Sequence, residues 1–199
     1  MRPYVNFILL AAILTTIAAT TGCHSSNAKY FLKTKSSANV YVERRPPKIE
    51  KVAVMPFTAQ TELTGSLISD LLVTELMRTG KYTVLERSQI NNVLRETELA
   101  MSGISSAQAV AVGKMLGADG VIIGTVSEYS TVARWGRTYP VVGFSVRLID
   151  TSSSQIIWSA DIVNQSKDRR LSLPEHARQV VHEGIAGLYQ QWHRYRQVR

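Results

Sequence analysis

The chain has 199 residues and a basic composition, with 23 Lys and Arg against 15 Asp and Glu and a formal charge of +8. Its single cysteine excludes an internal disulfide and with it the small disulfide-rich scaffolds. The length fits one domain with a short additional segment, and the basic balance is compatible with nucleic acid, anionic lipid or an acidic protein as partner.

Residues 1–22 have the pattern of a bacterial export signal. Arg2 supplies a positive start, and residues 5–19 form an apolar run interrupted by three polar side chains. Such a run is short for a transmembrane helix and typical of a signal sequence. Small residues then lead directly into Cys23, which predicts a lipoprotein signal peptide and a cysteine that carries lipid.

Two neighbours of Cys23 bear on this prediction. Thr20 stands where lipoprotein signals usually carry an aliphatic residue, so an ordinary secretory signal that leaves Cys23 as a free thiol is the alternative. His24 follows the cysteine in place of the aspartate that resembles an inner-membrane retention signal. In a Gram-negative source we therefore expect a lipid anchor in the outer membrane, with the protein facing the periplasm and meeting no nucleic acid.

Residues 23–48 are predicted to be a lipidated N-terminal tether. They are rich in Ser, Asn and Lys and end in a Pro pair flanked by basic residues, a composition that disfavours packed structure. Two short apolar islands, residues 30–32 and 40–42, either dock onto the domain or a neighbouring subunit, or are incidental in a free linker. The folded domain is expected at residues 49–199.

Hydrophobic periodicity places the elements of this domain in order. Short apolar runs rich in β-branched residues indicate strands, and apolar residues three and four apart indicate helices. A serine before such a stripe predicts a helix start, and a glycine after it predicts the end. We expect strands at 51–57, 82–86, 121–130, 141–150 and 155–164. Between the first two strands we expect a helix that ends at Gly80, with the stripe Leu67, Ile68, Leu71, Leu72 and Leu76, and after the second strand a helix capped by Ser88 and another capped by Ser105 or Ser106. A last helix should begin at Pro174, with the stripe Ala177, Val181, Ile185, Leu188, Trp192 and Tyr195.

The connections between the strands change along the chain. Residues 150–154 are turn formers, so the strands at 141–150 and 155–164 should form an antiparallel hairpin. Helices separate the earlier strands, which favours parallel pairing there. The expected fold class is therefore α/β, with a mixed β-sheet flanked by helices.

Six short segments, in their order along the chain, resemble the CsgG-like family of curli production assembly/transport components. They are residues 51–57 (KVAVMPF), 72–76 (LVTEL), 82–87 (YTVLER), 117–124 (GADGVIIG), 146–150 (VRLID) and 156–159 (IIWS). The resemblance implies a periplasm-facing lipoprotein whose fold is similar to the N-terminal domain of TolB.

The best-known members of this family secrete amyloid subunits through an oligomeric outer-membrane barrel, to which each subunit contributes amphipathic hairpins. A membrane-crossing strand needs about 9–11 residues. Such hairpins would be inserted at residues 126–143, part of which must extend the core strands, and at residues 162–173; both segments are short, charged and without sustained apolar alternation. We therefore expect a family member that keeps the periplasmic domain without pore-forming hairpins.

The remaining residues predict no catalytic, cofactor or metal site. No second histidine lies four residues from His182, as a zinc-binding helix requires. We select Arg87, Arg134, Trp135 and Arg137 as candidate partner contacts, because Arg87 lies between a strand and a helix and Trp135 is an aromatic among arginines. The alternatives are a surface ion pair for Arg87, and core packing or a membrane-surface anchor for Trp135.

Three functions follow from these observations. The first is a non-enzymatic lipoprotein that binds envelope proteins, or itself as a homo-oligomer, in curli-like assembly or transport by family resemblance. The second is an LpoB-like activator of a peptidoglycan synthase, which needs a long tether, whereas residues 24–48 reach about 85 Å at most. The third is an outer-membrane secretion-channel subunit, which needs the hairpins described above.

Overall fold

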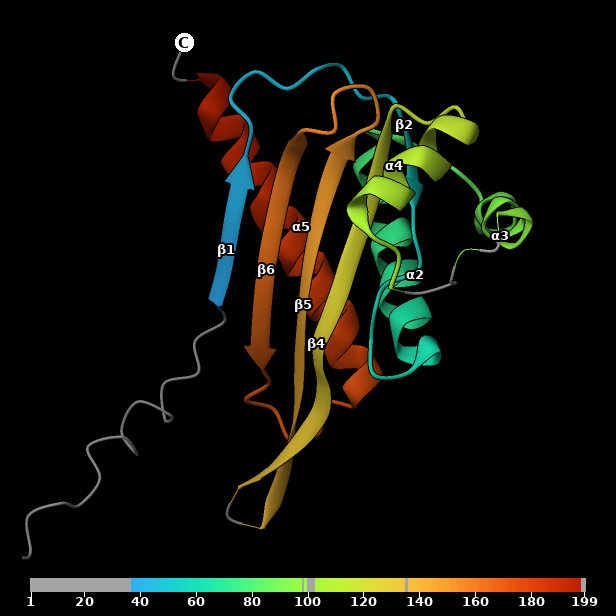
Figure 1. The fold of residues 1–199 in the computed structure, drawn as a ribbon. Coiled ribbons are helices and arrows are strands. Elements are labelled where there is room, and N and C mark those ends of the chain that lie inside the picture. Colours follow the sequence, from blue (N-terminus) through green and yellow to red (C-terminus); the bar gives the residue numbers. More distant parts are fainter. Residues whose placement is uncertain (1–36, 98, 100–102, 135, 198–199) are drawn as a thin grey trace, which may run out of the picture. The chain divides into compact units, whose positions relative to one another are not determined.

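The computed structural model describes residues 37–97, 99, 103–134 and 136–197, apart from the side chains of residue 37 and residues 195–197. The described chain forms one six-stranded sheet with the strand order β1-β6-β5-β4-β2-β3 (Figure 1). The strands are β1 (Ser37–Val42), β2 (Lys51–Val54), β3 (Thr83–Val84), β4 (Gly120–Arg134), β5 (Arg137–Asp150) and β6 (Ile156–Gln165). The helices are α2 (Glu62–Thr79), α3 (Arg87–Glu96), α4 (Ser106–Met115) and α5 (Leu173–Gln197).

The pairing confirms the predicted mixed sheet. β2 lies parallel to both β3 and β4. β4, β5, β6 and β1 follow one another in antiparallel pairs. The α/β fold class and the change from parallel to antiparallel pairing are therefore as the sequence predicted.

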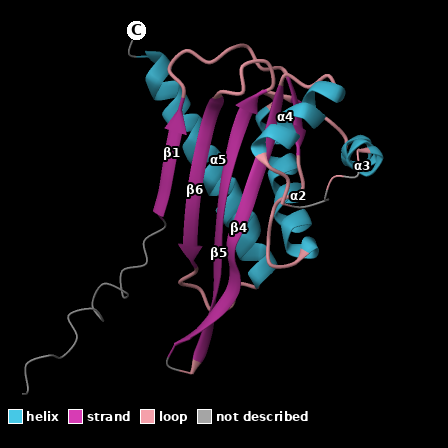
Figure 2. Cartoon of the chain, viewed as in Figure 1, coloured by secondary structure: helices cyan, strands magenta, loops and turns pink. Residues whose placement is uncertain are grey.

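Helices cover the two faces of the sheet unequally, which leaves part of one face without a helical layer. α2 and α5 pack on one face around a core that includes Phe57, Phe144 and Trp158. α3 and α4 pack on the other face over β2 and β4, around Met55 and Ile90. Figure 2 shows α5 behind β1, β6 and β5, with no described helix in front of β1 and β6.

The helix ends follow local capping chemistry. Gly80 adopts the left-handed conformation (φ 64°) that ends α2, as predicted, because glycine has no Cβ to clash there. Ser105 caps α4 in a reciprocal capping box with Gln108, also as predicted. The prediction that Ser88 caps α3 is wrong: the N-cap is Glu86, whose carboxylate accepts from the Ser88 N–H.

Strand β1 lies inside the segment that the sequence assigned to the tether. Its six residues pair with β6 from Ser37 opposite Val163 to Val42 opposite Trp158. Val42 is buried, and Gln191 of α5 donates to the Val40 carbonyl at 3.2 Å. The apolar island at residues 40–42 is part of this edge strand, which confirms the alternative in which it docks onto the domain, and the sheet begins at residue 37.

Residues 131–134 and 137–140, which lie between the predicted strands at 121–130 and 141–150, are also strand. β4 and β5 pair continuously to Arg134 opposite Arg137, with a register shift between Val126 and Glu128. β6 pairs with β5 only as far as Val141, so residues 131–134 and 137–140 form a two-stranded extension. Such a ribbon needs no buried face, which explains why apolar alternation did not reveal it. β6 ends at Gln165, one residue beyond the strand predicted at 155–164.

None of the helices in the part of the chain described above combines the length and the apolar character needed to cross a membrane.

Candidate partner-binding groove

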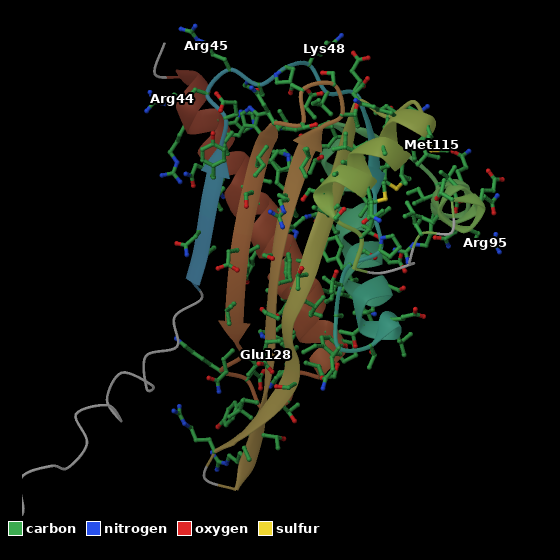
Figure 3. The ribbon with its side chains drawn as sticks, viewed as in Figure 1. Arg44, Arg45, Lys48, Arg95, Met115 and Glu128 are labelled. Carbon is green, nitrogen blue, oxygen red and sulfur yellow. The ribbon has the colours of Figure 1, made fainter. Side chains whose placement is uncertain are left out.

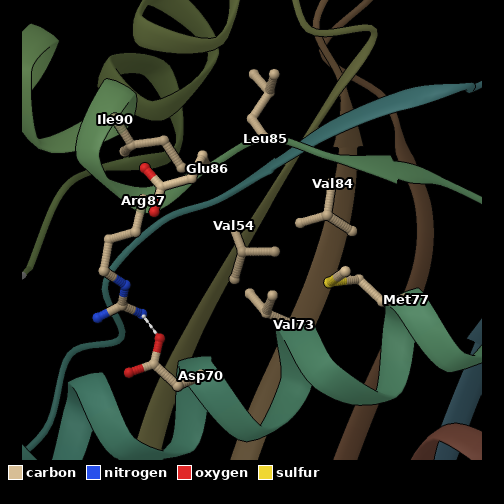
Figure 4. Close-up of a pocket in the computed structure, with 9 residues that line it drawn as sticks. All are labelled: Val54, Asp70, Val73, Met77, Val84, Leu85, Glu86, Arg87 and Ile90. Carbon is tan, nitrogen blue, oxygen red and sulfur yellow. Dashed lines mark ion pairs between the residues drawn. The ribbon is translucent and has the colours of Figure 1, made fainter.

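A groove opens between α2 and α3 beside β3, which is one edge of the sheet (Figure 4). It encloses about 310 Å³. Its walls are mostly apolar, with charged side chains gathered at one end. The lining residues are Val54, Asp70, Val73, Met77, Val84, Leu85, Glu86, Arg87 and Ile90.

The apolar wall on α2 comes from a second row of side chains beside the core stripe. Val73 and Met77 are four residues apart and therefore share one face of the helix. Leu72 and Leu76, one position earlier, are fully buried in the core, whereas Met77 is 63% exposed. An exposed, flexible methionine beside a groove is typical of adaptable binding surfaces.

The floor of the groove carries the outer edge of β3, which pairs with no further strand among the described residues. The N–H groups of Thr83 and Leu85 donate to the carbonyls of Glu50, just before β2, and of Val52, both at 2.8 Å. Because backbone groups alternate along a strand, the N–H and carbonyl of Val84 point away from β2. An edge of this kind can pair with an added extended segment.

The polar end of the groove is built around Arg87, one of the candidate partner contacts. Its guanidinium lies 2.7 Å from the Asp70 carboxylate and donates to the buried Ser69 hydroxyl at 2.5 Å. Arg87 therefore pairs within its own chain, as the alternative reading proposed, and joins α3 to α2 (Figure 4). The Asp70 side chain is 60% exposed, so this ion pair stabilises the fold by only about 0–1 kcal/mol.

Glu86 adds a negative charge beside Arg87. The Ser88 hydroxyl and backbone N–H both donate to the Glu86 carboxylate. These hydrogen bonds, that of the Ser88 side chain first, lower the pKa of Glu86 below its ordinary value. The groove thus ends in two carboxylates and one guanidinium, each of which already has a partner within the chain.

The structure does not gather the other candidate contacts at this groove. Arg134 and Arg137 are opposite one another at the end of the β4–β5 hairpin. Trp135 and the lipidation candidate Cys23 lie outside the described residues. The sequence analysis missed Val73 and Met77, although their spacing of four was a readable signal.

A polar cluster on the neighbouring surface joins α2 to α5. His182 lies 3.1 Å from the Glu75 carboxylate, which also pairs with Arg78 at 2.8 Å. Over the described residues, no group of three or more His, Cys, Asp or Glu side chains lies close enough together to hold a metal ion. Among these residues the groove is the feature best suited to binding.

Comparison with known proteins gives the family. The family model described as curli production assembly/transport component CsgG matches residues 35–157. The chain belongs to this family. The match includes β1 and starts close to the point at which the sheet begins.

Two solved structures share the fold of this CsgG-family protein. PelC from Paraburkholderia phytofirmans, solved as a dodecamer, has a TM-score of 0.57 and 20% identity over 77% of this chain and 97% of PelC. Lipoprotein GNA1162 from Neisseria meningitidis has a TM-score of 0.51 and 16% identity over 69% of this chain and 99% of GNA1162. Comparison with curated protein sequences gave no significant match.

Proposed function

We propose that this CsgG-family protein is a non-enzymatic lipoprotein, anchored through Cys23 to the outer membrane and facing the periplasm. In this position it binds envelope proteins and takes part in curli-like assembly or transport. The observation that carries the proposal is the family match over residues 35–157, which follows the export signal predicted to end at Gly22-Cys23.

The groove between α2 and α3 supplies the binding surface in this proposal. It offers an apolar wall with the exposed Met77, a free strand edge at Val84 and a charged end at Arg87. These features suit an extended protein segment, which pairs with the edge through its backbone and places alternate side chains in the groove. Since PelC was solved as a dodecamer, we extend self-association to this chain, with a second copy among the partners.

The tether weighs against the LpoB-like alternative. With β1 in the sheet, only residues 23–36 connect the anchor to the domain. Fully extended, these residues reach about 50 Å, compared with the 85 Å allowed by the predicted tether. A domain held this close to its membrane is suited to partners at the membrane surface.

We further propose that the protein acts without forming a pore. Beyond β6, the β4–β5 hairpin pairs residues 131–134 with residues 137–140, whereas a membrane-crossing strand needs about 9–11 residues. Recording in planar bilayers separates this proposal from a secretion channel, because discrete conductance steps from pure protein would favour the channel.

Two experiments test the main proposal. Metabolic labelling with a fatty-acid probe should label the wild type and not Cys23→Ser, and an unlabelled wild type would refute the anchor. For the groove, a photo-crosslinking residue at Met77 should capture envelope proteins or a second copy in cells. The matched control is Met115 on α4, which is 60% exposed, and equal capture from the two sites would refute the groove as the binding surface.

A further inference from the structure

Three features that are far apart in the sequence meet at one end of the sheet. β1 starts there, since Ser37 lies opposite Val163 near the end of β6. The β4–β5 extension projects from the same end, and the connection from β6 to α5 begins beside it, where the Ser166 N–H donates to the Pro140 carbonyl at 2.9 Å. We call two segments together the hairpin end: the extension, of which residues 131–134 and 136–140 are described, and residues 166–172.

The hairpin end is strongly basic. Its two segments carry five cations and one carboxylate, Asp168. Residues 167–170 are all exposed, and Asp168 accepts a hydrogen bond from the Arg170 N–H at 2.8 Å. Two further carboxylates lie nearby: Glu128 is on β4 just before the extension, and Glu175 on α5 accepts a hydrogen bond from the Ser172 hydroxyl. The five cations outnumber these carboxylates and Asp168, so the net charge of this end is positive. The cations are Arg134, Arg137, Lys167, Arg169 and Arg170.

The extension also has an amphipathic face. Val132 lies opposite Tyr139, and Arg134 lies opposite Arg137. Because side chains alternate along a strand, these four residues share one face of the ribbon. Val132 is 44% exposed, and tyrosine beside arginine is typical of surfaces that sit among lipid headgroups.

We propose that the hairpin end contacts the anionic headgroups of the membrane that anchors the protein. This inference rests on the lipid anchor at Cys23, from which the chain reaches the sheet at Ser37, at the hairpin end. A basic surface is attracted to an anionic leaflet and adds to the membrane binding that the lipid supplies. The domain is thereby held in one orientation, with the opposite end of the sheet turned away from the membrane.

The chain contains its own control for this orientation. A second basic cluster, Arg44, Arg45 and Lys48, follows the far end of β1, and Figure 3 shows it at the end of the molecule opposite Glu128. All three side chains are exposed. The control cluster therefore offers three exposed cations for substitution at a different position, although Lys48 pairs with Glu50 and Glu43 precedes Arg44.

Vesicle binding of the full chain carrying Cys23→Ser tests the proposal without the acyl group. Vesicles of phosphatidylcholine mixed with phosphatidylglycerol should bind this protein more tightly than phosphatidylcholine alone, and added salt should weaken the difference. Adding Arg137→Glu, Lys167→Glu and Arg169→Glu should lower binding to the anionic vesicles by roughly a hundredfold, since each basic residue near an anionic surface contributes about a fivefold factor. Adding Arg44→Glu, Arg45→Glu and Lys48→Glu should have a much smaller effect.

Equal losses from the two triple variants, or a larger loss from the control cluster, would overturn the proposal. The proposal would also be overturned if the protein showed no preference for vesicles with phosphatidylglycerol, whether or not it binds a soluble anionic polysaccharide.

A fluorophore at a single cysteine reports the orientation of the domain. Because Cys23 is the chain's one cysteine, the label can be placed on Thr138→Cys or on Met115→Cys in the Cys23→Ser chain. Emission should shift on anionic vesicles at position 138 and not at position 115. If fatty-acid labelling fails, the proposed lipid anchor is refuted, but the vesicle assay still tests the basic surface because it uses the protein without a lipid.

Discussion

Replacing Gly65 by alanine should move α2 and destabilise the protein. A Cβ on Gly65 would lie 2.1 Å from the Phe57 carbonyl oxygen, so the helix and the segment after β2 must separate by about 1 Å. Phe57 cannot yield easily, because its buried ring already lies against Gly124 of β4. Overpacking of this kind costs about 3 kcal/mol, and alanine returns about 1 kcal/mol in helix propensity. The net loss should be about 2 kcal/mol.

Gly187→Ala provides the matched control within the same fold. Gly187 also lies in a helix, α5, but a Cβ there meets nothing within 4 Å. The control should gain up to about 1 kcal/mol from helix propensity. In thermal melts, Gly65→Ala should lower Tm by about 4–8 °C and Gly187→Ala should raise it by about 2–4 °C. Equal melting temperatures for the two variants would refute the reasoning. A shifted α2 should also weaken capture at Met77, because that residue lies on the displaced helix.

Three further changes test the packing and the electrostatics. Arg87→Ala should cost about 1 kcal/mol in urea unfolding, since it removes an exposed ion pair and leaves the buried Ser69 hydroxyl without this donor; a loss above about 3 kcal/mol would show that the pair is more than a surface contact. Burial alone would raise the pKa of Asp150, but hydrogen bonds from Ser153 and Ser152 outweigh the burial and lower the pKa. The ionised carboxylate therefore stabilises the fold above about pH 4, and this stabilisation is lost as the pH falls through the lowered pKa. Asp150→Asn should therefore reduce Tm at neutral pH and approach the wild type in strong acid, whereas a difference independent of pH would contradict this account. Trp192→Ala should cost about 2 kcal/mol, because Trp192 is only partly buried at the margin of the core. Trp158→Ala, at a fully buried site, should cost about 3–5 kcal/mol. Thermal melts should therefore give the Trp158→Ala variant the lower melting temperature.

The elements that the sequence predicted well are those whose signals are local. The stripe that ends at Leu76 and the stop at Gly80 describe α2 because periodicity and the left-handed glycine act within a few residues. Ser105 was identified for the same reason. The Ser88 prediction failed because Glu86, two residues earlier, offers an equally good acceptor, and periodicity does not resolve helix starts that finely.

The features that the sequence did not predict depend on tertiary contacts. β1 shows in the sequence only as the apolar island at residues 40–42, and it is a strand because β6 pairs with its edge and α5 covers one of its faces. The hairpin extension has polar residues on an exposed ribbon, where alternation carries little information. The groove arises only when α3 packs beside α2, so the local sequence could not predict that Met77 would be exposed beside a groove. Trp192 was assigned to the buried stripe, but it lies near the end of α5, where the sheet gives less cover.

The pairing of β1 with β6 has a consequence for the order in which the sheet forms. Ser37 must meet Val163, so this edge of the sheet closes only after most of the chain has been synthesised. Contacts this distant in sequence carry a large loop-closure entropy and form slowly. Under the proposal that Cys23 is lipidated, a chain that emerges from its N-terminus presents this cysteine before β1 has found its partner.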